Sequence, residues 1–141
     1  RGEPRTMQEN PGYDDVVAEV AAFLEQRVQA CVDAGLGEEL TIVDPGFGFG
    51  KTHRHNVELL ANLRQLRVRD RPMLVGMSRK STLGELTQRD VHERLPASVA
   101  AAVVAILNGA DIVRAHDVQA TVDAVKVTRA VIEAAETRPE N

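Results

Sequence analysis

The sequence has almost no cysteine and few aromatic residues. Cys31 is the one cysteine in 141 residues, so no intramolecular disulfide can hold the fold, and a reducing compartment, the cytoplasm, is expected. Tryptophan is absent, and aromatic residues make up 3% of the chain. Phe47 and Phe49 nevertheless lie within one short glycine-rich segment, which marks that segment as unusual.

Long apolar runs and an excess of basic residues are also missing. No apolar run reaches the length of about 18 residues that a membrane span requires, so we expect no membrane partner. The formal net charge is −4, which is not the basic balance typical of nucleic-acid binding, so we expect no nucleic-acid partner. A hydrophobic share of 43% is ordinary for a globular protein, and we assign residues 1–141 to one domain.

The apolar residues that are present alternate between the spacing of helices and that of strands. Steps of three and four residues predict amphipathic helices, whereas short β-branched runs at residues 40–43, 73–77 and 112–115 predict strands. The helical stripes are Val17, Val20, Leu24, Val28 and Cys31; Val57, Leu60, Leu63 and Leu66; the apolar segment 97–107; and Val118, Val122, Val125 and Ile132. The predicted order is therefore α-β-α-β-α-β-α.

Short apolar strands that alternate with helices indicate an α/β fold with a parallel sheet. Two architectures fit this order: an open doubly wound sheet and part of a closed TIM barrel, (β/α)₈. Three strands are few for either fold, because their outer edges would remain unpaired. The sequence therefore resembles an incomplete sheet whose missing strands would lie on the N-terminal side.

A polar cluster follows each predicted strand. The first strand runs into residues 44–51 (DPGFGFGK), the second into residues 78–81 (SRKS), and the third contains Arg114 and ends at His116 and Asp117. The C-terminal ends of parallel strands converge on one face, where ligands bind. We therefore expect these three clusters to form one site.

The glycine-rich segment 44–51 is open to several interpretations. It can be a simple turn, but its alternating glycines would also let the backbone approach a ligand, and Phe47 and Phe49 suit a flat ligand. Asp44 can accept paired N–H groups from a nitrogen heterocycle, cap a turn or bind a metal. Two nucleotide phosphate-binding patterns do not match this segment. The P-loop pattern G-x-x-x-x-G-K-[ST] fails because position 45 is proline instead of glycine, and the dinucleotide pattern G-x-G-x-x-G fails because position 51 is lysine.

The other two clusters indicate anion binding. Lys80 and Ser81 precede a predicted helix, whose free N–H groups would add to their donors, although a solvated turn with serine as helix cap is the simpler alternative. Arg114 and His116 point the same way by strand alternation and suggest a second anion, such as a phosphate. Asp117 is interpreted as the cap of the last helix.

A zinc site at His53 and His55 is not expected, because no third ligand is evident at a suitable spacing. No metal ligand is therefore assigned within this sequence.

Together these motifs resemble those of dihydropteroate synthases. The matching segments are 44–51, 76–81 (GMSRKS), 114–117 (RAHD), 95–98 (LPAS) and 1–7 (RGEPRTM). The resemblance covers nearly the whole chain and implies the C-terminal part of a pterin-binding (β/α)₈ barrel, about three βα units and a preceding helix. The family joins 6-hydroxymethyl-7,8-dihydropterin pyrophosphate to 4-aminobenzoate in folate synthesis and releases pyrophosphate. Sulfonamides compete with the aminobenzoate.

The resemblance also implies residue roles. Lys80, Arg114 and His116 would be catalytic: Arg114 and His116 would bind the departing diphosphate, and Lys80 would contact the pterin ring. The substrate-binding set would be Asp44, Phe49, Gly76, Lys80, Ser81, Arg114 and His116. In it Asp44 would hold the amino-pyrimidine edge of the pterin, and Ser81 the aminobenzoate carboxylate.

The family's remaining site residues precede the matched region. They include an asparagine that takes part in Mg²⁺ and diphosphate binding, so the Mg²⁺ cofactor is expected to be held by an N-terminal half. The chain alone is therefore expected to have little or no activity. The family implies a homodimer formed through C-terminal helices. Two alternatives remain: a pterin-binding methyltransferase domain, and a half-barrel with only a structural role.

Overall fold

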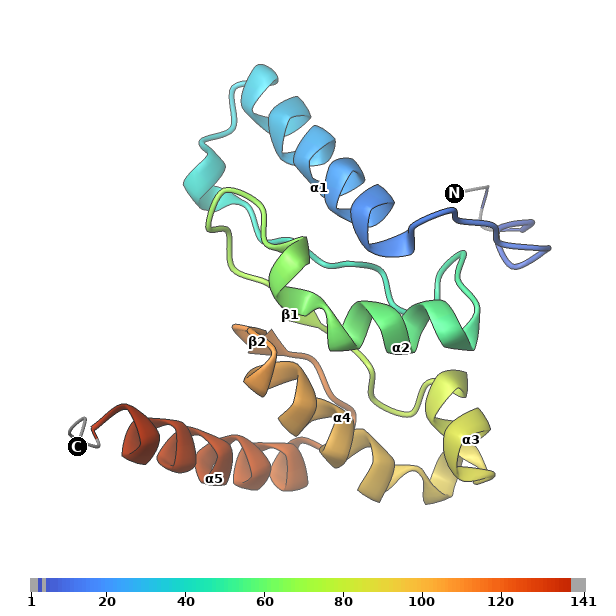
Figure 1. Ribbon diagram of the computed structural model, residues 1–141, viewed down its shortest axis with the longest axis vertical. Helices are drawn as coiled ribbons and strands as arrows, with labels where there is room; N and C mark the ends of the chain where they lie inside the picture. Colours follow the sequence, from blue (N-terminus) through green and yellow to red (C-terminus); the bar gives the residue numbers. More distant parts are fainter. Residues whose placement is uncertain (1–2, 4, 138–141) are drawn as a thin grey trace.

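The computed structural model describes residue 3 and residues 5–137, so residues 1, 2 and 4 of the opening motif lie outside the described part. The helices are α1 (Val16–Asp33), α2 (His53–Ala61), α3 (Ser81–Thr87), α4 (Leu95–Leu107) and α5 (Val118–Glu136). Short 3-10 helices lie between them: η1 (Glu38–Leu40), η2 (Leu63–Leu66) and η3 (Val91–Glu93). In Figure 1 the chain descends from α1 at the top to α5 at the bottom, with the strands between them.

The sheet is parallel, as predicted, but its strands are short. β1 (Leu74–Val75) pairs with β2 (Ile112–Val113) in parallel register. The predicted strand at 40–43 is wrong as a strand: its first residue belongs to η1, and Val43 alone forms a parallel bridge, to Met73. This segment lies at the outer edge of the sheet, where Ile42 is 55% exposed, and within residues 3 and 5–137 no further strand pairs on that side.

The first predicted helix is confirmed, and the second is confirmed in part. Asp15 caps α1 by accepting hydrogen bonds from the backbone of its first turn. In α2, however, Val57 of the predicted stripe is 41% exposed, and Leu59, outside that stripe, is fully buried. The helix ends at Ala61, and the chain turns into η2. The predicted helical spacing through Leu63 and Leu66 therefore crosses a change of helix type.

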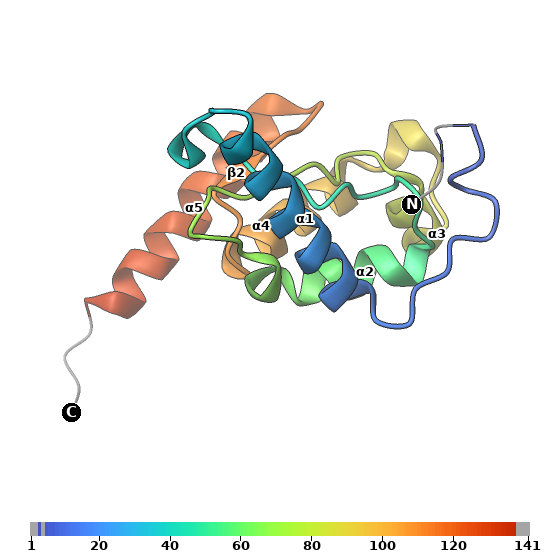
Figure 2. The ribbon, with the colours of Figure 1, turned by 90° about the horizontal axis from the view of Figure 1, so that it is seen from above.

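The last two helices are present, but the predicted burial is only partly right. The buried side chains of α4 are small ones, whereas Leu107 is 46% exposed. On α5 the predicted stripe is open: Val118 is 63% exposed, and the buried residues are Thr121 and Thr128. Figure 2 shows α5 extending beyond the rest of the molecule toward its C-terminal end. Across the described ranges no helix is long and apolar enough to cross a bilayer.

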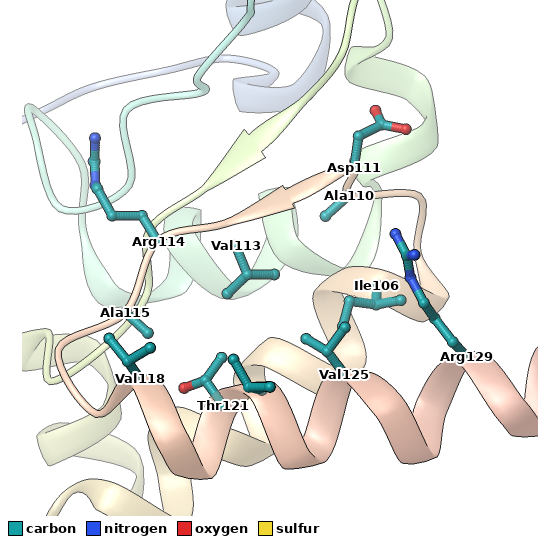
Figure 3. Close-up of a pocket in the computed structure, with 11 residues that line it drawn as sticks. Ile106, Ala110, Asp111, Val113, Arg114, Ala115, Val118, Thr121, Val125 and Arg129 are labelled. Carbon is teal, nitrogen blue, oxygen red and sulfur yellow. The ribbon is translucent and has the colours of Figure 1, made fainter.

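Alternation along the strands separates two faces. Met73, Val75 and Met77 are buried and pack in one core with side chains of α1, α2 and α4. Figure 3 shows the same division on β2, where Val113 points toward α5 and Arg114 points to the opposite side. The face away from the helices is therefore the one that carries Arg114.

A substitution at Leu59 tests the position of the hydrophobic core. Leu59→Ala is expected to lower the free energy of unfolding by about 2–5 kcal/mol, because its side chain is fully buried in the core cluster. Leu86→Ala on α3 is the control, since Leu86 is 62% exposed, and it should change stability by less than about 0.5 kcal/mol. Urea denaturation followed by circular dichroism measures both, and equal effects would contradict this placement of the core.

Candidate functional site

The three predicted polar clusters meet at the C-terminal ends of the parallel segments. They surround a cavity of about 370 Å³ on the face that carries Arg114. Its lining residues are Phe49, Gly76, Ser78, Lys80, Arg114, Ala115 and His116. The structure thus brings together side chains from all three clusters, and Asp44 joins them through a contact with Arg114.

Arg114 reaches across β1, which lies between β2 and the segment that ends at Asp44, to contact Asp44. Its Nη2 lies 3.3 Å from Asp44 Oδ2, and the two residues stand at the ends of the outer segments. The guanidinium passes over Gly76, where an added Cβ would lie 3.0 Å from Arg114 Nη2 and 3.2 Å from Nε. A side chain at position 76 would therefore press on the guanidinium, so glycine is the residue that lets Arg114 cross.

The glycine-rich segment is a folded loop held by polar side chains. Asp44 Oδ1 accepts a hydrogen bond from Gly46 N at 2.9 Å, and Asn56 Oδ1 accepts one from Gly48 N at 2.8 Å. Lys51 Nζ donates to two carbonyl oxygens of the loop, Gly46 O at 3.1 Å and Phe49 O at 3.2 Å. These contacts fix the loop shape without a ligand.

Gly48 shows why this loop contains glycine. Its φ of +77° is unfavourable for other residues, and a Cβ there would lie 3.1 Å from Lys80 Cδ. The two phenylalanines beside it differ: Phe47 is 1% exposed and packs in the core, whereas Phe49 is 55% exposed. The prediction that both aromatic rings would face a ligand is wrong, and Phe49 alone reaches the cavity.

Lys80 lies between the loop and the cavity. Its Nζ donates to Phe47 O and stands 4.7 Å from the centre of the Phe49 ring, a cation–π contact. Burial lowers the pKa of Lys80, and the carboxylate of Asp44 opposes that change. Burial likewise lowers the pKa of Lys51. An anion in the cavity would favour the charged form of Lys80.

His116 and Asp117 contact the loop that follows β1. His116 donates its backbone N–H to Ser78 Oγ at 3.1 Å, and its Nδ1 lies 3.0 Å from the same oxygen. Asp117 accepts two hydrogen bonds from Arg79, at 3.0 Å from Nε and 2.6 Å from Nη2. The guanidinium of Arg79 holds the pKa of Asp117 below its ordinary value. Asp117 stands at the N-cap position of α5, but its carboxylate pairs with Arg79, so its interpretation as a side-chain cap is wrong.

Ser81 is the predicted residue that the structure places apart. It is the first residue of α3, is exposed, and is not among the residues that line the cavity. Lys80, not a serine, is at the N-cap position of α3. Ser81 thus follows Lys80 directly in the chain, and no residue of α3 is among those that line the cavity.

The two histidines of α2 have structural contacts. His53 Nδ1 lies 3.2 Å from Thr82 Oγ1, and His55 forms a capping box with Thr52. Within residues 3 and 5–137, no group of three or more His, Cys, Asp or Glu side chains could hold a metal ion.

Asn56 was not predicted to belong to the site, and Lys51, Ser78 and Arg79 were predicted only as members of the polar clusters, without a role of their own. Asn56 is 1% exposed and also donates to Thr52 O and to Thr82 Oγ1, so it ties the glycine loop to α2 and α3. An asparagine within an otherwise amphipathic helix was the available signal, because a polar side chain on a buried helix face needs partners.

Comparison with known proteins assigns this arrangement to a family. The pterin binding enzyme family matches residues 1–116. Dihydropteroate synthase of Escherichia coli strain K12 is 47% identical over 138 residues, which cover 98% of this chain and 49% of that protein. Dihydropteroate synthase of Neisseria meningitidis serogroup B is 50% identical over 135 residues, covering 93% and 47%.

Solved structures agree. Yersinia pestis dihydropteroate synthase in complex with a sulfonamide drug superposes with a TM-score of 0.92 at 43% identity, over 95% of this chain and 49% of that one. The Burkholderia cenocepacia enzyme complexed with 7,8-dihydropteroate gives 0.91 at 51% identity, over 98% and 52%.

The chain spans about half the length of the relatives that it matches. The superpositions confirm the predicted fold class, an α/β fold that is part of a (β/α)₈ barrel. Both the sequence match and the fold therefore lead to one conclusion: the chain belongs to the pterin binding enzyme family.

Proposed function

We propose that this chain supplies the C-terminal part of a dihydropteroate synthase. The complete enzyme would join 6-hydroxymethyl-7,8-dihydropterin pyrophosphate to 4-aminobenzoate and release pyrophosphate. Identities of 47–50% to dihydropteroate synthases support this proposal. Relatives in complex with 7,8-dihydropteroate and with a sulfonamide drug support the same substrates and sensitivity to that drug class.

The observation that carries the proposal is the pair of Asp44 and Arg114. Both side chains are accessible, at 34% and 62% exposure, and their separation of 3.3 Å makes an open, solvent-screened contact. A pterin diphosphate offers each of them a better partner: paired N–H groups for the carboxylate, and an anion for the guanidinium. Such a ligand would replace the contact within the protein by two contacts of its own.

In this proposal the chemistry follows from charge placement. Arg114 and His116 bind the diphosphate, and their donors stabilise its negative charge as the C–O bond to the pterin methylene breaks. Lys80 and Phe49 contact the pterin ring beside the glycine loop, and Gly76 leaves space for Arg114. The amine of 4-aminobenzoate then attacks the methylene, while Ser81 and the first turn of α3 receive its carboxylate.

The chain is proposed to need an N-terminal half. A cleft of about 380 Å³ lies open between β2 and α5, and a second cleft of about 450 Å³ lies open between α1 and the glycine loop. Figure 3 shows the first, with Val113 and Val125 facing one another across it. Barrel strands from another half would cover both clefts. The single Asp44 carboxylate at the cavity does not make a cation site, so we assign Mg²⁺ binding to that other half.

A pterin-binding methyltransferase domain is the alternative within the same fold, and 4-aminobenzoate binding discriminates the two. Such a domain has no need of a receptor for the aminobenzoate carboxylate, which is the role proposed for Ser81. A structural half-barrel is the other alternative, and it would show no activity even after an N-terminal half is supplied. A reducing cytoplasm is the proposed location, in keeping with the lone Cys31.

We also propose a homodimer through the last two helices. An apolar groove of about 450 Å³ runs between α4 and α5, on the side of α5 away from the cleft of Figure 3. Its lining includes Leu107, Val127 and Val131, which are 46%, 66% and 61% exposed. Exposed valines at the spacing of one helix turn favour contact with a second copy of the chain.

Asp44→Asn tests the pterin pocket. The chain, alone and mixed with the N-terminal half of a relative, is titrated with a pterin pyrophosphate analogue by calorimetry. The substitution should weaken binding by about tenfold or more, because it removes the charged acceptor of the heterocycle's N–H groups. Asp33→Asn, at an exposed position at the end of α1, is the control and should bind as wild type. Equal affinities in all three chains would contradict the role of Asp44.

Arg114→Ala tests the leaving-group role. Pyrophosphate release is measured after the chain is combined with the N-terminal half, and the substitution should lower kcat by about a hundredfold. Arg54→Ala removes an exposed arginine of α2 and should leave kcat unchanged. No release by the wild-type combination, with both parts folded and associated, would favour the structural half-barrel.

Val127→Glu tests the homodimer. A buried carboxylate in the proposed interface should convert the dimer to a monomer in analytical ultracentrifugation. Val118→Glu is the matched control, because Val118 lies on the same helix with similar exposure, 63% against 66%, but lines the opposite cleft. A wild-type chain that sediments as a monomer at high concentration would rule out this interface.

A further inference from the structure

The contact between Ser78 and His116 continues the register of the sheet beyond its strands. Leu74 and Val75 pair with Ile112 and Val113, and Ser78 and His116 stand 38 residues apart, as those pairs do. Ser78 is 9% exposed, and both Ser78 and His116 line the cavity. A hydroxyl of low exposure thus lies against Nδ1 of His116, an exposed residue whose Nε2 has no hydrogen-bond partner within the described part of the chain.

The hydrogen bonds available to that hydroxyl select one form of the neutral imidazole. A serine hydroxyl has one proton to donate and two lone pairs to accept with. The backbone N–H of His116 occupies one lone pair of Ser78 Oγ, at 3.1 Å. If the ring proton is on Nε2, the hydroxyl donates its proton to Nδ1 at 3.0 Å, and both the Ser78 hydroxyl and Nδ1 have a partner.

The other tautomer leaves a donor without a partner. With the ring proton on Nδ1, both N–H groups of His116 would donate to Ser78 Oγ, and the hydroxyl proton would need a further acceptor. Within the described part of the chain, Ser78 Oγ has no hydrogen-bond partner other than His116. Because Ser78 is only 9% exposed, its hydroxyl proton has little access to water, and the tautomer that gives this proton an acceptor within the protein is favoured.

We infer that Ser78 is a positioning residue, whose hydroxyl holds neutral His116 in the Nε2–H tautomer. This form presents a hydrogen-bond donor to the cavity beside Arg114, whereas the Nδ1–H form would present a lone pair that repels an anion. The inference concerns the tautomer of His116 and rests on the proposed function only for the identity of the anion, a diphosphate.

The loop that carries Ser78 is held independently of this contact. Arg79 adopts a φ of +58°, and its backbone N–H donates to Ser98 Oγ at 3.0 Å. The carbonyl of Arg79 accepts a hydrogen bond from Arg94 Nη1 at 3.0 Å, and the guanidinium of Arg79 pairs with Asp117. Loss of the Ser78 hydroxyl therefore leaves the loop several anchors, and an effect on the ring can be separated from an effect on the fold.

Heteronuclear NMR of the ring nitrogens in the ¹⁵N-labelled chain tests the tautomer directly. The spectra are recorded at alkaline pH, where the ring is neutral, and His116→Gln assigns the His116 signals among those of the four histidines. The wild type should show the shifts of a pure Nε2–H ring, and Ser78→Ala should show averaged shifts that report both tautomers. Wild-type shifts of the Nδ1–H form, or no change in Ser78→Ala, would overturn the inference.

Two further variants separate positioning from structure. Ser78→Thr keeps the hydroxyl and should restore the wild-type shifts, whereas Ser98→Ala removes a hydrogen bond from the same loop without touching His116 and should leave them unchanged. A change in Ser98→Ala equal to that in Ser78→Ala would mean that the loop as a whole, not the hydroxyl, sets the tautomer. Should Ser78→Ala not fold, Ser78→Cys replaces it, because a thiol is a much weaker donor.

Inorganic pyrophosphate links the tautomer to the anion. Its affinity, measured by calorimetry on the chain with its N-terminal half, should fall about tenfold in Ser78→Ala and recover in Ser78→Thr. Unchanged affinity in Ser78→Ala would overturn the link between the hydroxyl and the anion. If pyrophosphate does not bind even the wild type while the ring shifts are as expected, the proposed function fails and the positioning role of Ser78 stands.

Discussion

The register of β1 on β2 is the constraint on which the rest of the site depends. The ladder itself is two residue pairs long, and its partners are 38 residues apart in the sequence. Side-chain hydrogen bonds join residues with the same separation on either side of the ladder: Asp111 accepts from Met73 N before it, and Asp117 accepts from Arg79 after it. Slipping this register by one residue would turn Arg114 toward α5 and away from the cavity. Because the ladder is so short, the contacts of Ser78 with His116 and of Arg79 with Asp117 extend the register at the C-terminal end, beyond the backbone hydrogen bond from Arg114 N to Val75 O.

The same geometry concentrates positive charge in a chain whose net charge is negative. Lys51, Lys80 and Arg114 all lie close to the one carboxylate of Asp44, and burial lowers the pKa of both lysines. An anion that enters the cavity relieves the mutual repulsion of these cations. The charge arrangement therefore favours an anionic ligand even though the protein surface as a whole does not attract anions.

The sequence predicted those features that depend on local pattern. The capped, amphipathic α1 and the convergence of three polar strand ends follow from periodicity and from the general geometry of parallel sheets. It did not predict features set by partners far away in the chain. The carboxylate of Asp117 at a helix start resembles a cap, but Arg79, 38 residues earlier, supplies two donors and takes it instead. Asn56 belongs to no sequence motif, because its role depends on hydrogen bonds to the glycine loop and to Thr82.

The open apolar stripe of α5 has a physical cause at the edge of the sheet. Val118, Val122 and Val125 repeat with helical spacing, yet they line the open cleft between β2 and α5. Figure 3 shows Val118 and Val125 in this cleft. At the opposite edge of the sheet Ile42 is exposed beside Val43, and Phe23 of α1 lines the second cleft. Apolar side chains thus remain uncovered at both outer edges of the three parallel segments, where they could contact further strands. An open sheet would need two separate sets of strands to cover these edges, whereas a sheet that curves into a barrel covers both with one set. The open clefts are therefore the physical counterpart of the half-length match to barrel enzymes.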